Sequence, residues 1–597
     1  MRKKLALFFS LVLCVCALGA QVSSDPSHEF YTLAQSWELR GIVAKLPPLR
    51  PYPVAVIKDI LSQVMQGGSE RDTEAASRIW EEVTGKPWSA ELEILANGAT
   101  FNDSGAFMLT AIPRVTGDLS LFHDFVSFGY KLGFVGRTQK NYMDFNPLFT
   151  NYAYDAIQDP ATIGPMFLYL DTDDSIAVGN TRLFAQAGVN RTGYGQFLDD
   201  GLCLNDTAYH AANFSLTYSA RRFSYAQQIS ALGATSSYDG RLGTLLPNKF
   251  LAFHVLEFKV SRIFSFSYYE NIVYGNRFEP SYLIPAPYMA VQGLGGNNDN
   301  LQMGITASVR PMDGFLWATD IFVDDIDVNG LVKFNWDTRI RIAARTGLIY
   351  TPANSFCSRV SLDYTIVTPY TYSHWEYDNW DTMSMSAGTR NYQNYTNNGI
   401  SMGASIPPNS DSFKFSVDFR PAPRLSLGVS TMFVRHANVS ESLTDDEALF
   451  YLSSDEGVYA TDGSVYEATA VAGGRQTYTS QNHLNFMTQA HKMYVFQGSV
   501  TGEYSLPRFK WGRLSFKGGF TFEYVRNKGV DKHMYPGGPV EKDKKSDPDN
   551  PSYIYNGKTY STPDEKAELA KLFKDKWAEG LSDSVDCYMY AGICYRF

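Results

Sequence analysis

Residues 585–597, VDCYMYAGICYRF, are the stretch that decides the fold. Val585, Met589 and Ile593 alternate with polar or small residues, and this spacing places the two kinds on opposite faces of one β-strand. A strand with one apolar face and one wet face suits a wall between lipid and a polar lumen. A terminal aromatic, Phe597, is typical of the closing strand that outer-membrane barrels present to their assembly machinery, which we therefore expect as a partner.

The same alternation recurs upstream, for example over residues 413–419 and 514–524. It predicts an all-β fold, a transmembrane antiparallel β-barrel of about 16–18 strands. Short turns at 260–263, 310–315, 420–424 and near Pro507 alternate with long polar segments, which we expect to be extracellular loops. Charged residues on the inner faces are predicted to line the lumen: Arg341, Arg345, Arg359, Asp363, Lys414, Asp418, Lys517 and Glu523.

The amino-terminal region predicts export. Arg2, Lys3 and Lys4 precede an apolar run to Leu18, so residues 1–20 are interpreted as a signal peptide cleaved after Ala20. Residues 21–88 carry helical periodicity and are predicted to form a small periplasmic helical element, followed by the barrel over 89–597. Beyond residue 20 no stretch offers the roughly 20 apolar residues that a membrane helix needs. Together these features predict the outer membrane of a Gram-negative-type bacterium.

Composition agrees with that location. Tyr (38) and Phe (39) are abundant enough for aromatic girdles at both membrane interfaces. Loss of three signal-peptide cations would change the formal charge from −10 to −13, which argues against a nucleic-acid partner. No residues have metal-site or cofactor-binding spacing, and Asp171, Asp173 and Asp174 are interpreted as turn-forming or solvated in preference to a calcium site. A monomer embedded in outer-membrane lipid is expected.

A helix is predicted within the last long loop. Thr562, Pro563 and Glu565 have the spacing of a capping box with proline at the first helical position, and Gly580 marks the end. The apolar face is expected to contain Leu569, Leu572, Phe573 and Trp577 and to pack on other loops or on the barrel wall.

Several short motifs in residues 251–326 carry a resemblance to a known family. They are H-x-L-E-F at 254–258, E-x-x-x-Y-G-x-R at 270–277, a Tyr/Pro-rich loop, and the amide and acidic residues 297–300 and 324–325. In this order they resemble the Wzi family of capsule-assembly outer-membrane proteins, and residues 31–52 resemble that family's periplasmic lead-in. The resemblance implies a barrel of about 18 strands with a helical periplasmic bundle. It also implies a role in holding surface polysaccharide.

Candidate polysaccharide-binding residues follow from these motifs, because sugars are bound by planar polar groups and aromatic platforms. They are Glu270, Tyr274, Arg277, Tyr288, Asn298, Asp299, Asn300, Asp324 and Asp325. The alternative is that these residues order loops and the barrel rim. Glu270 shares a strand face with Phe264, Phe266 and Tyr268, so it is expected beyond the hydrocarbon band or past a bulge.

Other functions stay open at this point. No His, Ser or carboxylate motif marks a catalytic site, so we expect a non-catalytic binding protein. The mixed inner charges fit either a diffusion channel for small solutes or a plugged barrel braced by ion pairs. An adhesin that displays its loops is a third possibility.

Overall fold

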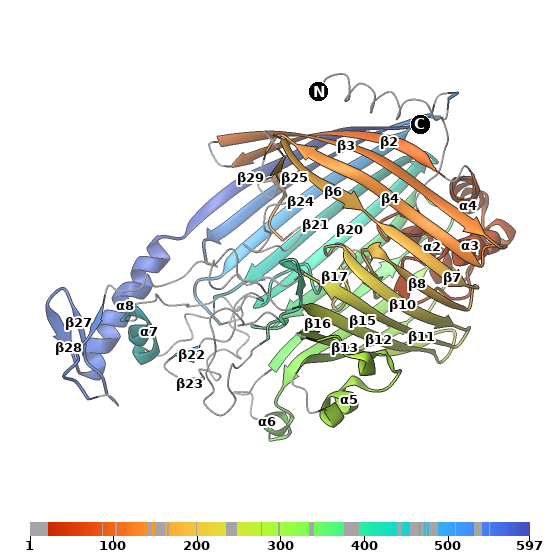
Figure 1. Cartoon of the computed structure of the whole chain (residues 1–597). Helices are drawn as coiled ribbons and strands as arrows, with labels where there is room; N and C mark the ends of the chain where they lie inside the picture. The colour runs from red at the N-terminus through yellow and green to blue at the C-terminus, as the bar shows by residue number, and fades with distance from the viewer. Residues whose placement is uncertain are drawn as a thin grey trace.

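The computed structural model describes residues 22–597 apart from 86–87, 102–103, 140–144, 150–161, 164–165, 199, 234–247, 276, 296–298, 334–339, 375–392, 439–444, 454–464, 466–470, 473–474, 477–487, 508, 511, 531–539 and 548–549. The predicted signal peptide lies outside these residues. The described part contains a closed antiparallel barrel of 18 strands, which confirms the predicted fold class (Figure 1). Among its helices, none is long and apolar enough to cross a bilayer.

The barrel strands follow one another around the wall in chain order. They are β2 (Ser89–Phe101), β3 (Ser104–Leu121), β4 (Val126–Arg137), β6 (Met166–Thr172) continued by β7 (Asp174–Gly179), β8 (Leu183–Asn190), β10 (Ala211–Ser219), β11 (Phe223–Leu232), β12 (Lys249–Lys259), β13 (Phe264–Gly275), β14 (Asn300–Val309), β15 (Phe315–Ile326), β16 (Ile340–Tyr350), β17 (Cys357–Val367), β20 (Ser410–Ala422), β21 (Leu425–His436), β24 (Met493–Ser505), β25 (Arg513–Lys528) and β29 (Ser582–Arg596). The first and last strands, β2 and β29, pair antiparallel and close the wall, with Ala96 opposite Ala591.

The wall has the two faces that the alternation predicts. On β29, Val585, Met589 and Ile593 are exposed on the outside, whereas Asp586 and Tyr588 are buried inside. Strand β25 repeats this pattern, with Phe516 and Phe520 exposed and Glu523 buried. Because exposed large apolar side chains recur on nearly every strand, they form a continuous outer band of the kind that faces lipid.

The two ends of the barrel differ. Short connections such as those between β12 and β13 and between β20 and β21 gather at one end, here called the turn end, as predicted. Long connections gather at the opposite end, here called the loop end (Figure 1).

Helices α2 (Glu29–Leu39), α3 (Val54–Gly67) and α4 (Glu70–Thr84) lie at the turn end (Figure 1). Ser69 and Asp72 form a capping box at the start of α4, and Phe30, Trp37 and Ile57 belong to a buried core shared by the helices. This helical element is held to the turns by ion pairs, which are Glu29–Arg420, Glu38–Arg310, Glu82–Arg513, Lys45–Glu257 and Lys58–Asp124.

Two of the long loops build a small subdomain at the loop end (Figure 1). It contains α7 (Asp445–Leu452), α8 (Pro563–Glu579) and a sheet of β26 (Glu541–Lys542), β27 (Tyr553–Tyr555) and β28 (Lys558–Tyr560). The capping box of Thr562 and Glu565 is confirmed. Leu569 and Phe573 are buried against α7 and the small sheet, but Leu572 is 39% exposed, so its predicted place on the packed face is wrong.

The remaining elements are short. Residues 276–299 contain the 3-10 turn η2 (Pro280–Leu283) and α5 (Tyr288–Gly295), and α6 (Val328–Val332) follows β15. The short strands are β1 (Leu49–Arg50), β5 (Thr162–Ile163), β9 (Gly193–Tyr194), β18 (Thr396–Asn397), β19 (Ile400–Ser401), β22 (Val471–Ala472) and β23 (Arg475–Gln476).

Candidate functional site: the lumen and the loop-end rim

The connection between β8 and β10, residues 191–210, folds back from the loop end into the lumen and is here called the inward loop. Tyr194 packs on Phe253 and Tyr269 of the inner wall, with ring centroids 5.5 and 5.4 Å away. Its hydroxyl lies 2.6 Å from Ser267 Oγ. Three strands further along the wall, Arg345 of β16 forms an ion pair with Asp200, 2.7 Å long. These contacts fix the inward loop to the inner wall between β12 and β16.

The helical element reaches the same loop from the turn end. Strand β1 pairs antiparallel with β9, with Leu49 opposite Tyr194. Arg50 forms an ion pair with Asp206, 3.2 Å between Nη2 and Oδ2, and both side chains are almost fully buried. Segments from the two ends of the barrel thus meet inside it.

A second segment, residues 393–409, fills more of the lumen. The Asn205 amide donates to the Met402 carbonyl at 2.9 Å, which links this segment to the inward loop. Tyr372 and Tyr395 donate their hydroxyls to the Leu202 and Cys203 carbonyls. The buried tyrosines and Met402 belong to one apolar cluster with inner-wall residues such as Phe322. Packed side chains therefore fill this part of the lumen.

A cavity of about 480 Å³ lies between the inward loop and α2, which bounds it at the turn end. It contains most of the predicted lumen-lining residues, namely Arg345, Arg359, Asp363, Lys414, Asp418 and Lys517. Arg345 Nε lies 3.5 Å from Asp363, and Lys517 pairs with Glu93. The lining mixes both charge signs, so it suits a hydrated polar chamber.

The other two predicted lining residues lie outside this cavity. Glu523 is fully buried and accepts hydrogen bonds from Gln497 at 2.6 Å and from the Leu148 amide at 2.8 Å. Arg341 lies nearer the loop end, with its guanidinium 5.8 Å from the Tyr370 ring. There burial, reinforced by the Arg341 charge, lowers the pKa of the loop residue His374 to about 3.

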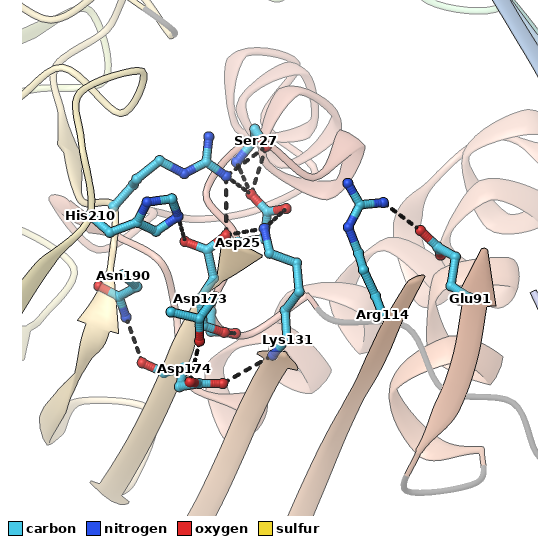
Figure 2. Close-up of polar contacts among 12 residues, drawn as sticks. Asp25, Ser27, Glu91, Arg114, Lys131, Asp173, Asp174, Asn190 and His210 are labelled. Atoms are coloured by element: carbon cyan, nitrogen blue, oxygen red, sulfur yellow. Dashed lines mark hydrogen bonds and ion pairs between the residues drawn. The ribbon is translucent and has the colours of Figure 1, made fainter. Parts of the chain in front are cut away.

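A polar cluster fixes the start of the described chain to the inner wall. Figure 2 shows Asp25, Lys131, Asp173 and His210 converging from different segments. Asp173, at the break between β6 and β7, pairs with Lys131 and lies 3.1 Å from His210 Nε2. Asp25 pairs with Arg191 at 2.7 Å. Asp173 is therefore buried and ion-paired, which corrects its interpretation as a solvated residue, and Asp174 accepts from Thr172 nearby. The Asp171 side chain lies outside the described residues.

The predicted polysaccharide-binding residues fall into two groups. The first group lies on the outer wall, within or beneath the segment that contains η2 and α5. Glu270 accepts from the Tyr288 amide at 2.6 Å and lies 3.0 Å from His254 Nε2. Arg277 pairs with Asp299 at 2.5 Å. Tyr274 and Tyr288 pack edge-on against Tyr282, which donates to Asp299 at 2.7 Å. Of this group only Arg277 keeps substantial exposure, 35% of its side chain.

The second group faces the lumen near the loop end. Asn300 donates to the Gln393 carbonyl at 2.9 Å, and Asp324 accepts from the Tyr372 amide at 2.8 Å. Asp325 stands opposite Arg341 in the β15–β16 register. Asn298 lies outside the described residues. The structure thus places loop-anchoring contacts at these positions and separates the two groups by the barrel wall.

Sequence reasoning missed the inward loop and the contact between Arg50 and Asp206. The inward loop carries aromatic and acidic residues, among them Tyr194, Asp200 and Asp206, between glycines, but no period or motif marks it as buried. Its burial depends on partners far away in the chain, such as Arg345, so the local sequence held no usable signal. Among the described residues, no group of three or more His, Cys, Asp or Glu side chains is placed to hold a metal ion.

The closed barrel with an outer apolar band and a filled lumen is the fold of an outer-membrane β-barrel protein. No family model matches the chain, and no curated protein matches it. Several solved structures, in contrast, are similar to the chain in fold. One is Wzi of Escherichia coli, described as an outer-membrane protein involved in group 1 capsule assembly and a carbohydrate-binding β-barrel. It is 8% identical, with a TM-score of 0.49, over 96% of this chain and 99% of that one.

Solved structures of Pseudomonas aeruginosa proteins are also similar. OccK8 (OprE) is 8% identical with a TM-score of 0.39, over 86% of this chain and 98% of that one. OprD is 9% identical with a TM-score of 0.36, over 86% and 97%. The resemblance to the Wzi family that the sequence motifs carry is thus found again among solved structures. At these identities the likeness concerns the fold.

Proposed function

We propose that this protein is a plugged outer-membrane barrel that binds or anchors a surface polysaccharide at its loop end, without catalysis. The observation that carries this proposal is the inward loop, which Arg345 ties to the wall and Arg50 ties to the helical element. A lumen filled in this way favours binding at the surface over flow through the barrel. Export by a signal peptide and a monomeric state belong to the same proposal.

The rim cluster around Arg277 is the best candidate for contact with a glycan. Its guanidinium is partly exposed and lies 6.0 Å from the Tyr274 ring. Sugars offer hydroxyls for charged planar donors and apolar faces for aromatic rings. Because Tyr274, Tyr288 and Asp299 are buried, their part would be to position the rim, and Arg277 would contact the ligand.

Binding of the purified full-length protein to an array of capsular and other surface polysaccharides tests the proposal. Arg277→Ala should weaken binding, whereas Arg424→Ala, an exposed arginine at the turn end, should leave it unchanged. Cells that lack the protein should make the polysaccharide but shed it. Full retention of the glycan together with no binding on the array would contradict the proposal.

A diffusion channel for small solutes is the second candidate. The charged cavity of about 480 Å³ favours it, because channels line their constrictions with such groups. A large and steady conductance of the intact protein in a planar bilayer would decide for this candidate.

A further inference from the structure

Residues 280–295, which include η2 and α5, cover the outside of the barrel wall. Ile229, Ala252 and Ile272 point outward from β11, β12 and β13, yet all are buried by this segment. Gln227 of β11 donates to the Tyr282 carbonyl at 2.7 Å, and the Tyr288 ring packs against His254 at a tilt, with ring centroids 4.2 Å apart. In Figure 1, α5 lies beside β12 and β13 on the outer side.

The uncovered apolar wall is short in this sector. On β13 only Phe264, Phe266 and Tyr268 lie outside the cover, a span of four residue steps or ~13 Å. On β24 the exposed outward residues run from Phe496 to Tyr504, eight steps or ~26 Å. A barrel needs an outer apolar band about 25 Å tall all around, and its tilted strands cross that band obliquely. The bare wall of β13 therefore supplies less than half of that height.

The covering segment replaces the missing half with its own outer surface. Its exposed side chains are large and apolar, with Ile284 at 56%, Met289 at 61% and Leu294 at 91% exposure. Residues 280–295 contain no Asp, Glu, Lys or Arg. The subdomain at the same end of the barrel is, in contrast, rich in lysine and acidic residues over 541–579.

Charged groups stand where this apolar surface stops. Arg277, Glu279 and Asp299 form a paired cluster at the base of the segment. Paired or partly exposed arginines are common at the level of lipid head groups. The His254–Glu270 pair, in contrast, lies under the segment and is shielded by Tyr288 from whatever surrounds the barrel.

We propose that residues 280–295 lie in the membrane leaflet at the loop end of the barrel, with Ile284, Met289 and Leu294 in contact with lipid acyl chains. The segment then completes the apolar band over β11–β14 and keeps lipid away from the buried His254–Glu270 pair. This loop is a membrane-embedded part of the barrel surface and not a free extracellular loop.

Photo-crosslinking of the full-length protein in phosphatidylcholine vesicles tests this assignment. Benzoylphenylalanine is placed at Met289 or Leu294, with Val500 on the bare wall of β24 as the lipid-facing control and Leu572 on α8 as the water-facing control. Mass spectrometry should find lipid adducts at 289 and 294 at a yield close to that at 500, and few or none at 572. Adducts to a second copy of the chain, or a yield like that at 572, would overturn the proposal.

A nitroxide at the same positions gives an independent measurement. In a variant without cysteines, Met289→Cys should show the high oxygen and low nickel-chelate accessibility of Val500→Cys. The reverse pattern, that of Leu572→Cys, would contradict lipid contact.

Discussion

Arg50 and Asp206 form an ion pair inside the barrel, although one precedes the first barrel strand and the other follows β8. Arg50 also donates to the Gly195 carbonyl at 3.2 Å. The pair therefore joins the turn-end helical element to a loop that enters from the opposite end.

Breaking this pair should loosen the plug. Arg50→Ala removes one member of a buried ion pair, which costs ~3–5 kcal/mol. We expect more frequent opening events in planar-bilayer recordings. Lys58→Ala removes the ion pair to Asp124 at the turn end, outside the lumen, so it is the matched control. The frequency of opening events should not increase in this variant. Equal traces for the two variants would show that the Arg50 contact does not hold the plug.

The two faces of β25 should tolerate charge differently. Phe520 is 45% exposed on the outer band, so Phe520→Arg should cost ~2–4 kcal/mol near mid-membrane. Thr521 faces the lumen, where its hydroxyl lies 2.8 Å from Ser499 Oγ, and Thr521→Arg should be milder. Urea unfolding from lipid vesicles measures both, and a reversed order would contradict the assigned faces.

The terminal residue should matter for assembly. The Phe597 amide donates to the Ala90 carbonyl at 2.8 Å, and its ring packs edge-on against Tyr595. We expect deletion of Phe597, or Phe597→Ser, to leave protein in the periplasm when cells are fractionated. Tyr595→Phe keeps an aromatic ring beside β2 and serves as the control. Normal surface levels of the deletion variant would count against Phe597 as a signal to the assembly machinery.

The attachment of α2 should depend on pH. Burial alone would raise the pKa of Glu29, but ion pairs with Arg78 and Arg420 outweigh it and lower the pKa from 4.5 to about 2. A carboxyl with a depressed folded-state pKa contributes its stability above the unfolded value and loses it as the pH falls. Amide exchange of α2, corrected for intrinsic rates, should therefore increase between pH 4.5 and 2. Glu29→Gln should abolish that increase, and Glu74→Gln, at an exposed site on α4, should not.

The repeating strand pattern could be predicted from the sequence, whereas the contacts between segments far apart in the chain could not. Alternation on strands such as β25 and β29 is a local property, so the wall, its two faces and its short turns follow from it. The capping box of Thr562 and Glu565 is equally local. The predicted ligand residues come from short motifs. A motif does not show whether its residues contact a glycan or anchor a loop. Glu270 illustrates this. The alternation along β13 predicts that its side chain points outward, but the segment that covers it is held there by contacts that no local pattern predicts.

The closure of the wall also encloses the amino-terminal segment. The last strand, β29, pairs with β2, and the chain that precedes β2 reaches into the lumen through Leu49 and Arg50. Val22 and Ser23 donate their amides to Asp118 on the inner side of β3. The wall that β2 and β29 close therefore surrounds the amino-terminal segment, so the chain that builds the barrel also supplies part of the material that fills it.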